Sequence, residues 1–481
     1  MMKQLIIYFT MLLAALCLGS CTEEKKEIDH TNFIIILVDD MGYGDVGYHG
    51  ALDMMTPNID KLAGQGVYFT QGYMSCSVCG PSRAGLISGR YQDKFGVWGN
   101  FGANSKKGFP DTQPMIQDML KHAGYKTGAI GKWHFGHAEE KFRPWNRNFD
   151  YYYGFLAGGH DYYWADTTYN QKQKDLWPIH RNEEIVKYKK GDYLTDKFNE
   201  EAVGFIERNH EEPFFLYLAY NAVHYPWSVP DSYLERIDEN YKHDYKYRRL
   251  LASMTLAIDD GVGQIMKTLE KHGIDENTAV IFLSDNGSPA TIAGPSSIST
   301  GDMVMSKKMG LRGYKGDTYE GGIRVPFLIK WPGVLPAGER YNEPVISIDI
   351  VPTITHFLGI DDPSTGYDGV NLIPYLTHEK EDVPHDYLYW RYQDEWAYRK
   401  GDWKMTWNTR EKVLHMTKDM VMNKQTIQPK LFNVKNDPFE RHDLMDQYPD
   451  KAKELFNAFT EMDSDMPDAG LFPVPFNRSI E

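Results

Sequence analysis

Five short apolar runs along the chain predict buried strands of one sheet. The runs are Phe33–Val38, Lys126–Ile130, Phe214–Ala219, Ala279–Leu283 and Pro326–Lys330. Continuous apolar runs of this length are typical of parallel strands that are covered on both faces. Helical periodicity lies between them, over Asp111–Ala123, Leu194–Asn209 and Tyr247–His272. This alternation predicts an α/β fold, with a large mixed, mainly parallel sheet sandwiched by helices.

Polar side chains follow four of these strands directly. The four segments are Asp39-Asp40, Gly131-Lys132-Trp133-His134, Tyr220–His224 and Ser284-Asp285-Asn286-Gly287. In open α/β sheets, ligands bind outside the carboxyl ends of the strands. The sequence therefore predicts a polar site at that edge of the sheet.

A boundary near Pro384 divides the chain into two parts. Beyond it, short strands are predicted over Tyr387–Arg391, Trp396–Arg399 and Trp403–Trp407, followed by a helix over Pro449–Met462. We therefore predict a large domain over residues 31–383. A smaller C-terminal α+β subdomain, with a small antiparallel sheet and a helix, is predicted over residues 384–481.

The N-terminus has the pattern of a targeting segment. A short basic start precedes the apolar run Leu5–Leu16, which is too short to span a membrane comfortably. The run ends in Leu18-Gly19-Ser20-Cys21, which resembles a bacterial lipoprotein signal. This pattern predicts removal of residues 1–20, a lipid on Cys21 and a tether over residues 21–30. The mature protein would then be exported and lipid-anchored in the bacterial envelope, in the periplasm or at the cell surface. The alternative is an ordinary secretory signal with a chance cysteine.

Charge and aromatic content narrow the range of partners. The formal net charge of -15 argues against a nucleic-acid partner. An anionic substrate would therefore need local cations or a metal for its binding. Aromatic residues make up 14% of the chain and gather at Tyr151–Tyr153 and Tyr162–Trp164. Such rings suit sugar binding, and core packing is the alternative explanation.

The segment Cys79-Gly80-Pro81-Ser82-Arg83 predicts an anion site around a nucleophile. Proline is favoured in the first turn of a helix, so Cys79 is expected at the positive helix end, with Arg83 one turn later. Only Cys76 and Cys79 remain once the signal is removed and Cys21 carries lipid, so no disulfide framework is expected. A redox Cys-x-x-Cys pair and a structural zinc site are alternatives that nothing else in the chain supports.

Cys79-x-Pro81-Ser82-Arg83 with the downstream Ser88-Gly89-Arg90 resembles the signature of type I, formylglycine-dependent sulfatases of the alkaline phosphatase superfamily. Further motifs that look like those of the family follow in order. They are Asp39-Asp40, Gly131–His134, His224, Ser284–Gly287, Gly313–Gly316 with Lys315, Glu320–Pro326 and Arg399–Lys404. The resemblance spans Asn32 to the C-terminus, and the overall pattern is similar to that of gut-bacterial carbohydrate sulfatases.

The resemblance implies that a maturation enzyme oxidises Cys79 to formylglycine, an aldehyde. One oxygen of the hydrated aldehyde attacks sulfur, and the second allows collapse to the aldehyde with release of sulfate. A serine would remain as a stable sulfate ester, so this covalent catalysis needs the second oxygen.

The resemblance also implies roles for the surrounding cations. Arg83 and Lys132 would hold the formylglycine and the charge that develops on it. His134 would take the proton that starts the collapse of the sulfated diol. His224 and Lys315 would hold the sulfate, and one of them would protonate the leaving alcohol.

Hard oxygen ligands predict a metal beside residue 79. Asp39, Asp40, Asp285 and Asn286 provide carboxylate and amide oxygens, which suit calcium or magnesium rather than zinc. The resemblance favours Ca²⁺ over Mg²⁺ and adds residue 79 as a ligand.

The substrate indicated by the resemblance is a sulfated carbohydrate, with sulfates of galactose, N-acetylgalactosamine or glucosamine all open. The loop Ala157–Trp164 is predicted at the rim of the site, where His160 and Asp161 would contact a sugar. Arg391 is expected to reach the same rim from the C-terminal subdomain. Exo action is preferred over endo action. The alternatives are a phosphodiesterase or phosphonate monoester hydrolase of the same superfamily, and a catalytically inactive glycan-binding lipoprotein.

Overall fold

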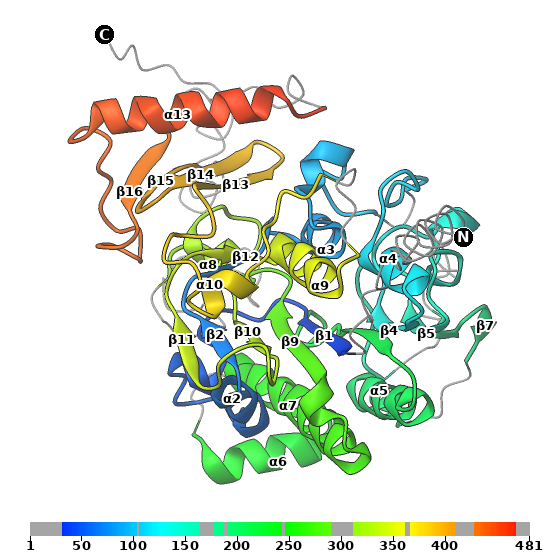
Figure 1. The fold of residues 1–481 in the computed structure, drawn as a ribbon. Coiled ribbons are helices and arrows are strands. Elements are labelled where there is room, and N and C mark those ends of the chain that lie inside the picture. Colours follow the sequence, from blue (N-terminus) through cyan, green and yellow to red (C-terminus); the bar gives the residue numbers. More distant parts are fainter. Residues whose placement is uncertain are drawn as a thin grey trace, which may run out of the picture.

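One mixed sheet forms the centre of the computed structural model (Figure 1). The structure describes residues 31–102, 105–163, 178–186, 191–242, 246–289, 311–360, 366–408 and 428–467. In spatial order the strands are β11 (Glu339–Tyr341), β2 (Val67–Phe69), β10 (Phe327–Lys330), β9 (Thr278–Ser284), β1 (Asn32–Val38), β8 (Phe214–Ala219), β4 (Lys126–Lys132), β5 (Tyr151–Phe155), β6 (His180–Arg181) and β7 (Glu184–Ile185).

The centre of this sheet is parallel, and antiparallel pairs occur on both flanks. Strands β9, β1, β8, β4 and β5 run in one direction, with Leu37 paired to Leu283 on one side and to Ala219 on the other. The strand predicted over Pro326–Lys330 is present as β10, but it runs antiparallel to both β9 and β2. The prediction of a mixed, mainly parallel sheet is confirmed.

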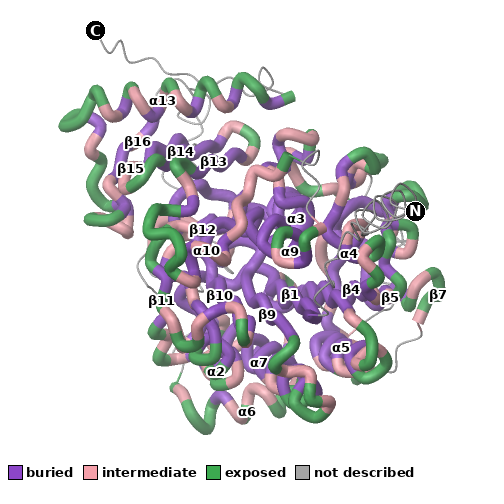
Figure 2. Tube along the Cα trace, in the orientation of Figure 1, coloured by how far each residue is buried: buried purple, intermediate pink, exposed green. Residues whose placement is uncertain are grey.

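Helices cover both faces of the sheet because its strands are apolar on both sides. Alternate residues of β1 separate two cores: Ile34 and Ile36 belong to one, and Phe33 and Ile35 to the other. Figure 2 shows the buried centre of the sheet between helices whose outer surfaces are exposed. The first core is covered mainly by α2 (Pro57–Gly64), α5 (Leu194–Asn209) and α7 (Lys246–His272). The second core is covered by α3 (Cys79–Ser88), α4 (Ile116–His122) and α9 (Ile350–Leu358).

The helix predicted over Asp111–Ala123 is shorter than expected. It begins at Ile116, because Pro114 restricts the preceding residue to extended backbone. The Asp118 carboxylate accepts a hydrogen bond from the Met115 N–H at 2.8 Å and so caps the start of the helix. The described part of the large domain also contains the helices α6 (Asp231–Asn240), α8 (Glu320–Ile323) and α10 (Ile373–Leu376). Strands β3 (Gly72–Tyr73) and β12 (Val345–Ile346) form a separate parallel pair.

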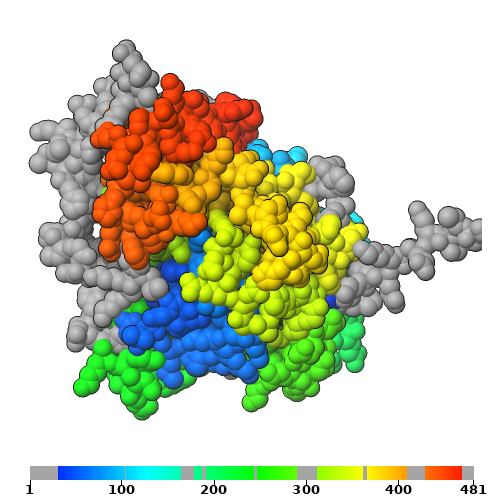
Figure 3. All heavy atoms as spheres, turned by 60° about the vertical axis from the view of Figure 1, so that its left-hand side comes forward, coloured from blue at the N-terminus to red at the C-terminus, as the bar shows by residue number. Residues whose placement is uncertain are grey.

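A small antiparallel sheet follows the large domain. Its strands are β13 (Tyr387–Tyr392), β14 (Glu395–Lys400), β15 (Trp403–Trp407) and β16 (Lys430–Asn433). Helix α13 (Pro449–Ser464) lies across this sheet in Figure 1, and Trp396 stacks on Phe459 at their interface. Figure 3 shows these orange and red residues packed directly against the yellow and green part of the chain. The predicted C-terminal α+β subdomain is confirmed, whereas its boundary at residue 384 stays a prediction.

The predictions for the N-terminus lie outside the described residues. They are the signal over residues 1–20, the lipid on Cys21 and the tether over residues 21–30. Among the helices that the structure describes, none has both the length and the apolar composition needed to cross a bilayer.

Candidate active site

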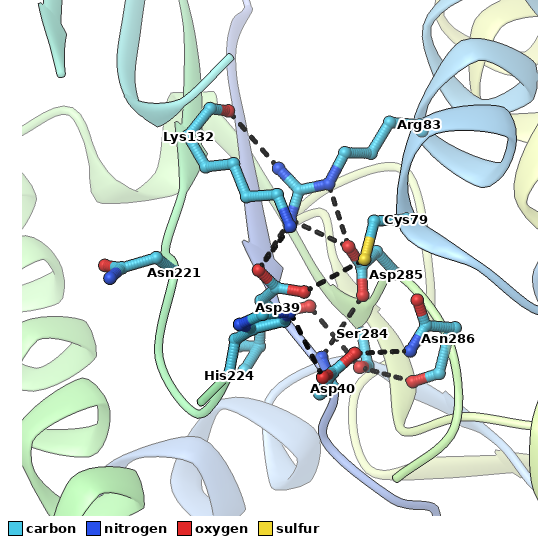
Figure 4. Close-up of polar contacts among 12 residues, drawn as sticks. Asp39, Asp40, Cys79, Arg83, Lys132, Asn221, His224, Ser284, Asp285 and Asn286 are labelled. Carbon is cyan, nitrogen blue, oxygen red and sulfur yellow. Dashed lines mark hydrogen bonds and ion pairs between the residues drawn. The ribbon is translucent and has the colours of Figure 1, made fainter. Parts of the chain in front are cut away.

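Four neighbouring strands bring the predicted polar segments together at one edge of the sheet. Asp39 and Asp40 follow β1, Lys132 ends β4, His224 follows β8 and Asp285 follows β9. Because β4, β8, β1 and β9 are adjacent and parallel, their carboxyl ends meet at the same place. Figure 4 shows these side chains pointing toward one another and toward Cys79 on α3.

A glycine permits the close packing behind this edge. Gly131 has a positive φ of 105°, and a Cβ on it would lie 1.9 Å from the carbonyl oxygen of Ala219 on the next strand. Only glycine fits such a position. The chain can therefore leave β4 in a tight path that brings Lys132 and His134 to the site.

Three buried carboxylates and the Cys79 sulfur form a compact cluster. Oxygens of Asp39, Asp40 and Asp285 and the Cys79 Sγ all lie within 4.8 Å of one another. Burial alone would raise the pKa values of Asp39 and Asp40, but the ammonium groups of Lys132 and Lys315 hold them below the usual value. Both carboxylates are therefore ionised at neutral pH.

The donor set of this cluster fits a hard divalent cation. The Asn286 amide donates to Asp40 Oδ1 at 2.7 Å, while its buried Oδ1 has no hydrogen-bond partner. A buried carbonyl oxygen without a partner is costly unless another ligand satisfies it. Carboxylate and amide oxygens are the ligands that Ca²⁺ and Mg²⁺ prefer. The predicted metal ligands Asp39, Asp40, Cys79, Asp285 and Asn286 thus converge on one place.

Each of the three carboxylates has a short contact with one cationic side chain. The Arg83 Nε donates to Asp285 Oδ2 at 2.8 Å. The Lys132 ammonium donates to Asp39 Oδ2 at 2.6 Å. The Lys315 ammonium lies 2.5 Å from Asp40 Oδ1 and 3.1 Å from Cys79 Sγ. The three predicted cations therefore surround residue 79.

Cys79 is the first residue of α3, as predicted, and its side chain is buried. Its Sγ lies 3.4 Å from Asp39 Oδ1. Burial, followed by the charges of Asp285 and Asp39, raises the pKa of the Cys79 thiol to about 12. The surroundings therefore keep this thiol protonated, in contrast to the low-pKa cysteines that act as thiolate nucleophiles.

His134 is a buried and neutral imidazole. Burial, with the nearby charges of Lys132 and Arg83, lowers its pKa well below 6.5. Its Nδ1 is buried without a hydrogen-bond partner. A Cβ on Gly158 would lie only 2.6 Å from the His134 Nε2, so the loop backbone packs directly on the ring. A neutral, firmly held imidazole has the protonation state that a general base needs.

His224 lies at the more open side of the cluster. Its Nδ1 is 2.6 Å from the carbonyl oxygen of Tyr225, which leaves Nε2 facing Asp40 at 3.8 Å. The side chain is 25% exposed, so it can meet a substrate that enters from solvent. The six predicted catalytic residues are thus assembled around one point.

The predicted rim loop lies beside the site, but His160 does not face solvent. Gly158 contacts His134, and a Cβ on Gly159 would lie 3.5 Å from His224. The His160 ring is 2% exposed and packs on Phe155 at 5.0 Å. The expectation that the His160 side chain is on the rim is therefore wrong.

Asp161 is partly exposed, and its Oδ1 accepts a hydrogen bond from the Tyr163 N–H at 2.8 Å. Its contact with a sugar stays a prediction. Trp164, the last residue of the predicted loop, lies outside the described residues.

The prediction for Arg391 is wrong. Its side chain is 3% exposed and forms an ion pair with Asp463 of α13 inside the C-terminal subdomain. The backbone carbonyl of Arg391 accepts a weak hydrogen bond from the Cys76 Sγ at 3.6 Å. Cys76 is a buried free thiol.

The sequence interpretation gave no individual role to three residues near the site. The Ser284 hydroxyl accepts from the Met41 N–H and donates to the Asn286 carbonyl, both at 2.9 Å, and so fixes the turn after β9. Tyr225 is 58% exposed beside His224. Gly158 holds His134 by contact. Ser284 lies within the segment Ser284–Gly287 and Tyr225 directly follows His224, which is the signal that the sequence offers for these two residues.

The match to known proteins decides the family. A model of the sulfatase family matches residues 31–360, and the N-sulphoglucosamine sulphohydrolase C-terminal family matches residues 314–465. The chain belongs to the sulfatase family. It is accordingly a sulfuric ester hydrolase with the alkaline-phosphatase-like fold, which confirms the predicted family and enzyme class.

Relatives of this family cover most of the chain. The N-acetylgalactosamine-6-sulfatase of Mus musculus is 30% identical over 460 residues, 87% of this chain and 83% of the relative. A sulfatase of Escherichia coli (strain K12), YdeN, is 31% identical over 412 residues, 75% of this chain and 68% of the relative. The crystal structure of Ps i-CgsB in complex with k-i-k-neocarrahexaose is 33% identical, with a TM-score of 0.79, and covers 92% of this chain and 94% of that one.

Proposed function

We propose that this sulfatase removes sulfate from a sulfated carbohydrate, with formylglycine at position 79 and a bound calcium ion. The observation that supports the nucleophile is the environment of residue 79, at a helix start among three carboxylates and three cations. The protein groups around it, without a bound metal ion, raise the pKa of the Cys79 thiol to about 12, so they do not themselves favour a thiolate. As a hydrated aldehyde, residue 79 would supply one hydroxyl that attacks sulfur and a second that allows sulfate to leave.

The residues of this chain divide the remaining work. Lys315, 3.1 Å from the Cys79 Sγ, lies where it can hold the sulfate group of a substrate. His134 is neutral and can accept a proton from residue 79 without first losing one. His224, at the open side, is placed to face the leaving alcohol. The charge-assisted contacts of Lys132 and Arg83 keep the carboxylates in place.

Asp39, Asp40, Asp285 and Asn286 would hold the cation. Its charge would polarise the oxygens of residue 79 and of the sulfate. The buried Asn286 Oδ1 supports this assignment, because no group in the described part of the chain donates a hydrogen bond to this oxygen. Calcium is preferred to magnesium on the family resemblance.

The open side of the site supports a carbohydrate as the alcohol that is released. Tyr225 exposes an aromatic ring beside His224, and its edge-to-face contact with Trp227, 5.1 Å between centroids, holds it there. Exposed rings of this kind stack on the apolar faces of sugars. Because relatives are named for N-acetylgalactosamine 6-sulfate and one was crystallised with a neocarrahexaose, we propose a galactose or hexosamine sulfate, attacked from the chain end.

Maturation and location complete the proposal. A formylglycine-generating enzyme would modify Cys79, and a lipid on Cys21 would anchor the protein in the bacterial envelope. Mass measurement of the mature N-terminal peptide and of the peptide that contains residue 79 tests both statements.

The decisive experiment compares substrates and variants. Wild-type protein produced with a formylglycine-generating enzyme should hydrolyse 4-nitrophenyl sulfate and release sulfate from members of a panel of sulfated mono- and disaccharides. Cys79→Ala should be folded and inactive, and Cys79→Ser should show at most one turnover. Faster hydrolysis of bis(4-nitrophenyl) phosphate than of the sulfate would instead indicate a phosphodiesterase. Full activity of Cys79→Ala would contradict the nucleophile assignment.

A further inference from the structure

Three fully buried ionisable side chains join the large domain to the C-terminal subdomain. Glu320 begins α8, Lys404 lies on β15, and Glu440 lies between β16 and α13; all three are 0% exposed. The Lys404 ammonium lies 2.8 Å from Glu320 Oε1 and 2.9 Å from Glu440 Oε1. The Glu440 Oε2 also accepts a hydrogen bond from the Glu320 backbone N–H at 2.7 Å.

Stability alone does not explain this cluster. The desolvation of buried charges largely cancels their attraction, and well-packed apolar residues in their place are often as stable or more so. The Glu320 carboxylate is nevertheless fully satisfied, because Tyr73 donates to Oε2 at 2.7 Å and Arg324 lies 3.4 Å from the same oxygen. A polar network that is satisfied in this way fixes the geometry of the groups that it joins.

The cluster fixes both ends of the turn that carries Lys315. At the start of the turn, Arg312 donates to the Glu440 carbonyl at 2.6 Å. At its end, the Glu320 N–H donates to the Glu440 carboxylate, and the Gly321 N–H donates back to the Arg312 carbonyl at 2.6 Å. Glu440 therefore closes the turn from the side of the C-terminal subdomain.

The middle of the same turn reaches the active site. The Lys315 N–H donates to the Ser288 carbonyl at 2.9 Å, and the Gly316 N–H donates to the Ser77 carbonyl at 2.8 Å. The Lys315 ammonium then lies 3.1 Å from the Cys79 Sγ. A shift of the ends of the turn would move this ammonium relative to residue 79.

We propose that Lys404 and Glu440 of the C-terminal subdomain are positioning residues, which set the place of the Lys315 ammonium through the turn 312–323. The subdomain thereby takes part in catalysis through the position of this turn. This inference rests on the proposed role of Lys315.

A double-mutant cycle on the full-length, formylglycine-containing protein tests the inference. Lys404→Met keeps the length of the side chain and removes its charge, and Glu440→Gln keeps the shape of its carboxylate. Each is expected to lower kcat/KM for 4-nitrophenyl sulfate by about 10- to 100-fold, as a misplacement of up to about 1 Å predicts. In a Lys315→Ala background, the same changes should lower kcat/KM by less than about twofold.

A matched control separates positioning from loss of stability. Asp463→Asn breaks the buried ion pair with Arg391, which joins β13 to α13 within the same subdomain. It should lower the melting temperature but leave kcat/KM within about twofold of wild type. If Lys404→Met does not fold, Arg312→Met at a half-buried position perturbs the same turn and must show the same dependence on Lys315.

The possible results distinguish two failures. Equal losses from Lys404→Met or Glu440→Gln with Lys315 present and with Lys315 replaced would overturn the positioning role. Wild-type activity of Lys315→Ala itself would instead contradict the role of Lys315 in the proposed function.

Discussion

The contact between Gly158 and His134 makes a sharp prediction for Gly158→Ala. The added Cβ would lie 2.6 Å from Nε2 and 2.8 Å from Cε1 of the His134 ring. The first distance is about 0.8 Å shorter than 3.4 Å, where ordinary van der Waals contact begins. His134 is buried, so its ring has little room to turn away. Either the ring or the loop must therefore move by about this distance.

That movement should lower the catalytic rate more than it lowers the stability of the fold. A misplacement of about 1 Å in a catalytic group costs about 100-fold in rate, so we expect kcat to fall by about that factor. Overpacking costs about 1–3 kcal/mol of unfolding free energy, which a large domain should tolerate. Initial rates with 4-nitrophenyl sulfate, normalised to the formylglycine content from mass spectrometry, measure the first effect, and thermal melts measure the second.

The neighbouring glycine provides the control. A Cβ on Gly159 would lie 3.5 Å from Cε1 of His224, which is an ordinary contact. Gly159→Ala should therefore keep kcat within about threefold of wild type. Both glycine-to-alanine changes reduce the backbone entropy of the unfolded chain, so the comparison isolates the contact with the His134 ring. Equal kcat values for Gly158→Ala, Gly159→Ala and wild type would refute the reasoning that the loop holds the His134 ring in place.

Three further results are expected. EDTA should abolish hydrolysis and lower the melting temperature, with recovery in excess Ca²⁺, and an unchanged melting curve would count against the metal site. Tyr225→Ala should raise KM for the best sulfated sugar by about 3- to 10-fold with little change in kcat, whereas an unchanged KM would remove this ring from the substrate site. Burial lowers the pKa of His385, but its ion pair with Asp349, 2.9 Å between Nε2 and Oδ2, outweighs this and raises the pKa. The ion pair therefore contributes its full stability below about pH 6.5, and this contribution is lost as the pH rises through the raised pKa of His385. His385→Asn should lower the free energy of unfolding, measured in urea, by more at about pH 6 than at about pH 9. An equal loss at both pH values would contradict this expectation.

Local pattern predicted the parts of the fold that local physics determines. Continuous apolar runs such as Phe33–Val38 mark strands that are covered on both faces, and the polar residues after them mark the carboxyl edge of the sheet. The direction of β10 was not predictable in this way, because a buried strand has the same apolar sequence pattern whether it pairs parallel or antiparallel with its neighbour. The helical pattern continues through Pro114, so it predicts a start at Asp111, whereas α4 begins at Ile116 after the extended residue Met115.

Side-chain direction in the C-terminal subdomain depends on partners that are distant in sequence. Arg391 follows an aromatic pair in a strand, but its side chain turns toward Asp463, 72 residues later. Lys404 is a charged residue in a predicted strand, and sequence alone would place such a side chain on the face of the strand that meets solvent. Its two carboxylate partners come from segments 84 residues before it and 36 residues after it. Such charges are recognised as buried only when the tertiary contacts are known.

The charge balance of the site explains how an acidic protein can attract a sulfate ester. The cluster pairs three carboxylates with three cations, namely Asp39, Asp40 and Asp285 with Lys132, Lys315 and Arg83. These charges sum to zero, and the rest of the chain is acidic, with a formal net charge of -15. A divalent cation held by the same carboxylates would give the site a net charge of +2. Because charges beyond about 8 Å are largely screened at physiological salt, this local excess, rather than the field of the whole protein, would draw the anionic group toward residue 79.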